Sequence, residues 1–204
     1  MKINGKGGAH TNLHGLNFEQ ITSLASCIKR DLGNKYKLIP HKFTRKKPKP
    51  DTIGNSKDYA FDIIKRANNK RIGIVTKQNR FYNVLWDIYG LKNANSKKWK
   101  PDEALFNFKT NTVYIVEKKW QSEGGSVDEK VFGFVNKRRL YQKDFNQLKK
   151  EPKPTVQFCT LLNSSWWING NHTSYQDYFD ALRSDGIKIF FDKYQYWWFG
   201  LQNQ

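Results

Sequence analysis

Three residues near the middle of the chain, Asp102, Glu117 and Lys119, are of the types that can hydrolyse a phosphodiester. Two carboxylates can hold a magnesium ion whose other ligands are water and a substrate phosphate. The ion polarises the phosphate and lowers the pKa of a water molecule. A nearby lysine can orient that water, take its proton or stabilise the transition state. If the fold brings the three side chains together, their types predict Mg²⁺-dependent hydrolysis.

A β-hairpin over residues 104–119 is the element that would bring them together. It consists of two runs of β-favouring residues around a short polar turn. The second run is apolar at consecutive positions, which is typical of a central strand. A turn centred after Thr110 places Asp102 opposite Lys119. Residues two apart on a strand share a face, so Glu117 and Lys119 point the same way.

Two alternatives remain open for this site. The register of the hairpin could slip by a residue or two, which would bring Glu103 forward in place of Asp102. The Glu-x-Lys pattern could also be a coincidence, because 36 of the 204 residues are Lys or Arg. Asp128-Glu129-Lys130 fits a carboxylate-x-Lys pattern too, but it follows a Gly-Gly-Ser break where a helix is expected to begin.

Two short motifs resemble the signature of the PD-(D/E)XK nuclease superfamily. They are Pro101-Asp102 and, at the end of the apolar strand, Glu117-Lys118-Lys119. Two further stretches resemble the type II restriction endonuclease branch of that superfamily. One is the segment 7–19, which begins Gly-Gly-Ala-His-Thr-Asn, and the other is 120–130, which contains Gly-Ser-Val-Asp-Glu-Lys.

The resemblance implies an α/β (α+β) fold with a restriction-endonuclease-like core, in which a mixed β-sheet is flanked by helices. It also implies that Asp102, Glu117 and the backbone carbonyl of Lys118 bind Mg²⁺, with Lys119 as the catalytic lysine. Glu19 on the first helix is a further candidate ligand, although a helical projection puts it almost opposite the apolar face. Three polar residues could support the site or contact phosphate: Gln121, Ser126 and Lys130. The alternative is that they are only helix-start and surface residues.

The formal net charge of +18 indicates a polyanionic partner. Such a surface attracts nucleic acid, because neutralised phosphates release their counterions. We expect contacts with double-stranded DNA from a basic arm near residues 35–50 and from the helix after the active-site strand. The candidate DNA-contacting residues are Arg45, Lys46, Lys47, Lys137, Arg138, Arg139, Gln142 and Lys143.

Hydrophobic periodicity and turn signals predict the remaining elements. Residues 4–15 are expected to form a loop, and a helix capped by Asn17 is expected to run to a stop at Gly33. The other predicted helices cover residues 59–67, 126–150 and 175–183, and the other predicted strands cover 71–76, 155–162 and 187–191.

Length, hydropathy and cysteine content narrow the class of protein. The length fits a single domain over residues 1–204. No run of 18 apolar residues and no signal-peptide pattern is found, which argues against a membrane partner. Cys27 and Cys159 are the only cysteines, so a disulfide framework is excluded and a cytoplasmic location is expected.

We therefore expect a type II restriction endonuclease that cleaves double-stranded DNA at a specific sequence with Mg²⁺ as its cofactor. A palindromic target would favour a homodimer, because two-fold protein symmetry matches two-fold DNA symmetry. A related alternative is a repair or resolvase-type nuclease of the same superfamily. An alternative of a different class is a non-catalytic, basic nucleic-acid-binding protein.

Overall fold

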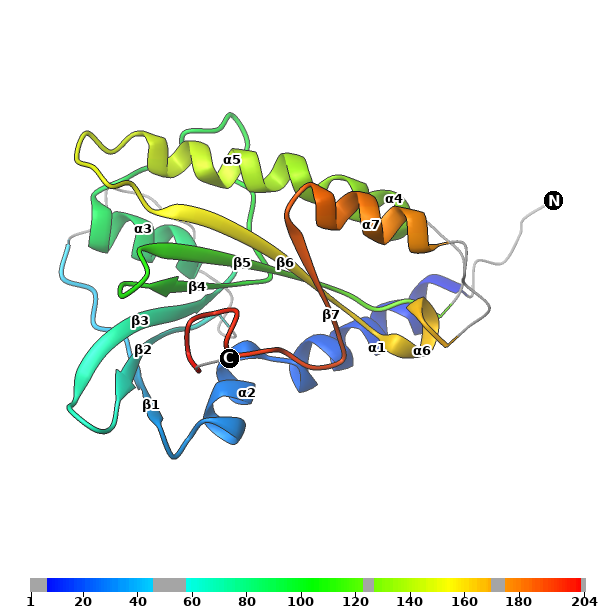
Figure 1. Ribbon diagram of the computed structural model, residues 1–204, viewed down its shortest axis with the longest axis horizontal. Coiled ribbons are helices and arrows are strands. Elements are labelled where there is room, and N and C mark those ends of the chain that lie inside the picture. Colours follow the sequence, from blue (N-terminus) through cyan, green and yellow to red (C-terminus); the bar gives the residue numbers. More distant parts are fainter. Residues whose placement is uncertain (1–6, 46–57, 123–126, 170–174, 203–204) are drawn as a thin grey trace.

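The computed structural model describes residues 7–45, 58–122, 127–169 and 175–202, and a seven-stranded sheet runs through them (Figure 1). The helices are α1 (Gly7–Ile21), α2 (Leu24–Asp31), α3 (Arg80–Tyr89), α4 (Val127–Phe132), α5 (Phe134–Asn146), α6 (Ser164–Trp167) and α7 (Gln176–Ser184). The strands are β1 (Tyr36–Pro40), β2 (Ala60–Lys65), β3 (Lys70–Lys77), β4 (Glu103–Asn107), β5 (Thr112–Lys119), β6 (Thr155–Leu162) and β7 (Ile187–Phe191).

The strands lie in the sheet in the same order as in the sequence. From β1 to β5 each neighbouring pair is antiparallel, whereas β5–β6 and β6–β7 are parallel. The parallel pairs need crossover connections, and helices α4 to α7 lie in those connections. The predicted α/β class and the mixed sheet flanked by helices are therefore confirmed.

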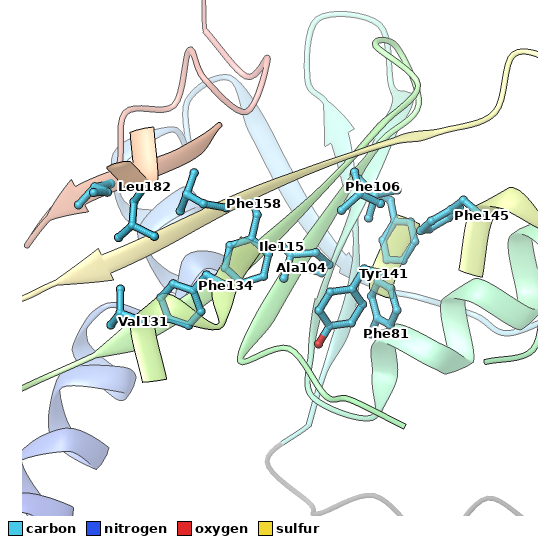
Figure 2. Packing of buried hydrophobic residues seen from close by; sticks show 14 of the residues in the cluster. Phe81, Ala104, Phe106, Ile115, Val131, Phe134, Tyr141, Phe145, Phe158 and Leu182 are labelled. Carbon is cyan, nitrogen blue, oxygen red and sulfur yellow. The ribbon is translucent and has the colours of Figure 1, made fainter. Parts of the chain in front are cut away.

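Buried side chains form a hydrophobic core on each face of the sheet. On one face, α3, α4, α5 and α7 cover the strands, and Phe81, Phe106, Tyr141 and Phe145 pack together there (Figures 1 and 2). On the other face, α2 and the C-terminal segment after β7 cover alternate residues of the same strands. Both faces of β4 and β5 are thus buried, which explains why β5 is apolar at consecutive positions.

The predicted hairpin is present as β4 and β5, but its register differs from the predicted one by two residues. Asn107 pairs with Thr112 and Glu103 with Val116, so Asp102 lies in line with Glu117 and not with Lys119. The turn begins earlier than expected because the Asn107 side chain accepts hydrogen bonds from the backbone N–H groups of residues 109 and 110.

The N-terminal region forms two helices where one was predicted. Residues 7–21 form α1, so the predicted loop over 4–15 and the predicted cap at Asn17 are wrong from Gly7 onwards. Helix α1 ends at Ile21. Ser23 caps α2 by accepting a hydrogen bond from the N–H of Ser26. The predicted stop at Gly33 agrees with the end of α2 to within two residues.

Three further assignments differ from the prediction. Residues 60–65 form strand β2, not a helix, because β1 and β3 pair with both of its edges. The predicted helix over 126–150 is two helices, α4 and α5, separated at Gly133, a residue that weakens a helix. Helix α3 was not predicted, although its apolar spacing and the left-handed Gly90 after it are typical helix signals.

Part of the predicted basic arm belongs to the sheet. Residues 36–40 form the edge strand β1, so this part is no free arm. The next turn is held by Asp87, which accepts hydrogen bonds from the backbone N–H groups of Thr44 and Arg45. Lys46 and Lys47 lie outside the described residues.

Among the helices that are described, none is long and apolar enough to cross a membrane.

Candidate active site

The structure brings Asp102, Glu117 and Lys119 together where β4 begins and β5 ends. The Lys119 ammonium lies 3.5 Å from Asp102 Oδ2 and 3.3 Å from Glu117 Oε2. Both acids lie on the face of the sheet covered by α5. Their neighbours in the sequence, Glu103 and Lys118, point to the other face, towards α2. The three predicted residues therefore form one cluster.

Backbone hydrogen bonds fix the position of Asp102 relative to β5. Its Oδ2 accepts a hydrogen bond of 2.8 Å from the backbone N–H of Lys118, and its Oδ1 lies 3.5 Å from the side-chain amide of Gln78. The carbonyl oxygen of Lys118 accepts a 2.8 Å hydrogen bond from the Lys119 ammonium. The predicted third oxygen ligand thus lies at the same cluster as the two carboxylates.

Burial dominates the electrostatics of Glu117, whose side chain is only 3% exposed. It raises the pKa of Glu117, and repulsion from Asp102 raises that pKa further, against the lowering effect of Lys119 and Lys137. Burial lowers the pKa of Lys119, but the carboxylates of Asp102 and Glu117 outweigh it, so the net direction is upwards. Lys119 is therefore an ammonium group and donates hydrogen bonds at neutral pH.

The oxygen atoms of this cluster are of the type that could hold a divalent cation. Within the described residues, Glu117 Oε1 is buried and has no hydrogen-bond partner. Asp102 and the carbonyl of Lys118 supply further hard oxygen donors, which Mg²⁺ prefers. The described residues contain no group of three or more His, Cys, Asp or Glu side chains that could hold a metal. A cation here would therefore rest on two carboxylates, a backbone carbonyl and water.

Glu19 lies on α1 near the same cluster. Burial raises the pKa of the half-buried Glu19 side chain, and the next cause is repulsion from Asp102. The Lys118 ammonium donates a 3.2 Å hydrogen bond to the backbone carbonyl of Glu19, which links α1 to β5. The structure thus brings Glu19 within the electrostatic reach of Asp102, in spite of its place on the helical projection.

Glu103 does not join the cluster. It is buried on the opposite face of the hairpin, where it forms an ion pair with Lys118 and accepts hydrogen bonds from the Leu24 backbone N–H at 2.8 and 3.0 Å. The Tyr59 hydroxyl also donates to Glu103. The alternative register in which Glu103 replaces Asp102 is therefore wrong.

A second lysine, from α5, enters the cluster. The Lys137 ammonium lies 3.1 Å from Glu117 Oε2, the same oxygen that Lys119 contacts. Lys137 was predicted to contact DNA, because spacing along the chain does not show which turn of a helix meets the end of a strand. One turn further along α5, the buried Tyr141 hydroxyl has no hydrogen-bond partner among the described residues.

The other predicted residues of α5 lie away from the carboxylates. Arg138 donates a 3.2 Å hydrogen bond to the carbonyl of Gly186. Gln142 uses both ends of its amide on the start of β6, donating to the carbonyl of Pro154 and accepting from the N–H of Val156. Arg139 and Lys143 are exposed. A pocket of about 460 Å³ is lined by Arg138, Arg139, Gln142, Asn146, Thr155, Val156 and Gln157.

The predicted supporting residues are not all near the site. The buried Gln121 follows β5, and its backbone exchanges two hydrogen bonds with the Asn163 side chain. Lys130 is exposed on α4. Ser126 lies outside the described residues. The structure therefore keeps Gln121 close to the end of the active-site strand and shows no contact between Lys130 and the carboxylates.

A basic, aromatic segment that leads into Asp102 was not among the predicted site residues. Lys97, Lys98, Trp99 and Lys100 directly precede Pro101. The Lys97 ammonium lies 4.3 Å from the centre of the Trp99 ring, and Lys98 lies over Tyr82 at 4.8 Å. The Tyr82 hydroxyl donates to the Trp99 carbonyl. We call residues 97–100 the rim segment.

Comparisons of the chain with protein-family models, with curated proteins and with solved structures found no match. The functional interpretation therefore depends on the geometry of the carboxylate cluster and on the two short motifs that form it.

Proposed function

We propose that the protein is a Mg²⁺-dependent type II restriction endonuclease of the PD-(D/E)XK superfamily, which hydrolyses double-stranded DNA at a specific sequence. The observation that carries the proposal is the convergence of Asp102, Glu117 and Lys119 on the α5 face of one hairpin. The mixed sheet flanked by helices is the architecture that this superfamily implies, and a restriction-endonuclease-like core is part of the proposal.

Each residue of the cluster has a role in phosphodiester hydrolysis. Asp102, Glu117 and the Lys118 carbonyl would hold the cation, which supplies charge neutralisation and a water of lowered pKa when bound. Lys119, as an ammonium group, donates a hydrogen bond to the attacking water or to a phosphoryl oxygen. The water oxygen bonds to phosphorus and gives up a proton to solvent, one ester bond breaks, and the leaving oxygen takes up a proton from solvent, so the products are a phosphomonoester and a hydroxyl group.

Double-stranded DNA is the proposed substrate because the chain is strongly basic and several of its lysines directly precede Asp102. The rim segment places three lysines and Trp99 directly before Asp102. Lysines at such a position bind phosphates and fix the register of the duplex. A homodimer is the assembly that a two-fold symmetric target would favour.

Cleavage of plasmid DNA with and without Mg²⁺ tests the proposal. We expect discrete bands with the wild type and Mg²⁺, and a loss of at least about a thousandfold in rate for Glu117→Ala and Lys119→Ala, since each removes a group that acts on the reacting phosphate. Lys70→Ala is the matched control, because it removes an exposed lysine at the far end of β3.

Unchanged cleavage by Glu117→Ala would disprove the proposed site. Retarded mobility of DNA without cleavage under any divalent metal would instead favour the non-catalytic binding protein, which the net charge of +18 also accommodates.

A further inference from the structure

Lys137 is an unusual residue for its position on α5. It lies in the first turn of the helix, where the N-terminal dipole is positive and disfavours an ammonium group. Residues 134–137 contain no acid that could compensate. The compensation comes from outside the helix, from Glu117 Oε2 at 3.1 Å. The tertiary structure thus holds Lys137 at the carboxylate cluster.

Lys137 also shares its carboxylate oxygen, Glu117 Oε2, with Lys119. Lys119 already contacts both Glu117 and Asp102. With Lys137 added, the cluster contains two carboxylates and two ammonium groups, which sum to a formal charge of zero. A cluster built only to hold a divalent cation would gain nothing from a second ammonium group, because that group competes with the cation for Glu117.

Cation binding would change the partners of both lysines. The open acceptor, Glu117 Oε1, is available to a cation while Oε2 is held by Lys119 and Lys137. The two ammonium groups would lose much of their attraction to Asp102 and Glu117 if these carboxylates held a divalent ion. The next anion at the cluster is the phosphodiester of the substrate.

The position of Lys137 suits such a contact. Its side chain is 24% exposed, so Lys137 is not sealed in the core as Glu117 is, whose side chain is 3% exposed. The ring of Phe134 lies 5.6 Å from it and the ring of Trp99, in the rim segment, lies 6.0 Å from it. These aromatic faces attract an ammonium group and border its position between the rim segment and Glu117.

We propose that Lys137 is a second catalytic lysine, which contacts the scissile phosphodiester and stabilises the negative charge that develops on it during hydrolysis. This inference rests on the proposed nuclease function. In the absence of a cation Lys137 is paired with Glu117, and in the presence of a cation and DNA it is paired with the phosphate. Lys119 and Lys137 then act on the phosphate from β5 and from α5.

Single-turnover cleavage at saturating DNA, titrated with Mg²⁺, tests this role. We expect Lys137→Gln and Lys137→Ala to lower the rate at saturating Mg²⁺ by about 10²–10³-fold, the effect of removing one donor to a developing oxyanion. Lys137→Arg keeps the charge and should retain the rate to within about tenfold. The Mg²⁺ concentration for half-maximal rate should not rise, because a competitor for Glu117 has been removed.

DNA affinity and thermal melting test whether a lower rate in the Lys137 variants comes from weaker DNA binding or from loss of the fold. DNA affinity measured in EDTA should stay within about threefold of the wild type for Lys137→Gln, because Lys137 is then paired with Glu117 and contributes little to binding. Thermal melting of each variant tests folding, and Lys137→Gln keeps much of the side-chain length if Lys137→Ala fails to fold. Lys70→Ala again is the control for the loss of one positive charge.

Two outcomes would overturn the inference. One is a wild-type rate for Lys137→Gln at saturating Mg²⁺, and the other is a full rate that merely requires more Mg²⁺. If Glu117→Ala abolishes cleavage while the Lys137 variants cleave normally, only the role of Lys137 is wrong. If the wild type cleaves no DNA with any divalent metal, the nuclease function fails and the inference fails with it.

Discussion

At the scale of single residues, the ionised Glu117 lowers the stability of the folded protein, although the proposed reaction needs it. Burial raises its pKa, and Asp102 adds to the shift, so the ionised carboxylate is less favourable in the folded protein than in the unfolded chain. The folded pKa lies above the unfolded value. Its stabilising contribution is therefore fully present below the unfolded pKa and is lost as the pH rises through the folded pKa.

Glu117→Gln should consequently melt at a higher temperature than the wild type at neutral pH in EDTA, while losing cleavage. The difference should shrink as the pH falls towards the ordinary pKa of a glutamic acid, because Glu117 is then protonated in both states. Thermal melts across this pH range measure the effect. Glu151→Gln is a suitable control, since the exposed Glu151 has a lowered pKa, owing to hydrogen bonds from Lys153. A Glu117→Gln variant that melts below the wild type at neutral pH would contradict the prediction.

At the scale of elements, a buried ion pair lies on the face of the hairpin β4–β5 opposite the carboxylate cluster. Lys118 and Glu103 are 2% and 1% exposed, respectively, and face α2. The Leu24 backbone N–H, at the start of α2, donates to Glu103, and the Lys118 ammonium donates to the Glu19 carbonyl on α1. Because Lys118 also presents its backbone to Asp102, the pair links both N-terminal helices to the strand that forms the site.

Removing one partner of this pair should be costly. Lys118→Met leaves Glu103 buried without its counter-charge, and we expect a loss of about 3–5 kcal/mol in the free energy of unfolding. The double variant Glu103→Gln/Lys118→Met should recover most of that loss, because no charge remains buried. Urea unfolding measures both. If Lys118→Met unfolds like Lys70→Ala, the pair does not hold the hairpin.

At the scale of the whole molecule, the positive charge and the carboxylate cluster have separate roles. A net charge of +18 would attract a polyanion, such as the DNA proposed as substrate, over long distances, whereas the cluster itself is formally neutral. The lysines of the rim segment belong to this positive charge and directly precede Asp102 of the cluster in the sequence. Its phosphate contacts should therefore appear in the salt dependence of binding.

Replacing Lys97, Lys98 and Lys100 together by Ala should weaken DNA binding and make it less sensitive to salt. Each lost phosphate contact lowers the slope of log K against log salt by about 0.9, so we expect a decrease of up to about three. Fluorescence anisotropy at several salt concentrations, in EDTA, measures the slope. The exposed Lys70 and Lys109, at the opposite end of the sheet, provide the control. An unchanged slope in the triple variant would show that the rim segment does not contact phosphate.

The sequence by itself determined the parts that depend on neighbours along the chain. Alternation and apolar runs predicted β3, β5, β6 and β7, and the position of Glu117 and Lys119 on one strand face follows from the period of two. The same local information misassigned β2 as a helix, because only its pairing with β1 and β3 decides its conformation.

Only the tertiary structure decided which residues meet at the site. The Asn107 turn set the register that aligns Asp102 with Glu117 and sends Glu103 to the opposite face. The packing of α5 on the sheet brought Lys137 to Glu117. A register and a helix–sheet contact depend on hydrogen bonds and packing between segments far apart in the chain, which no local pattern of residue types contains.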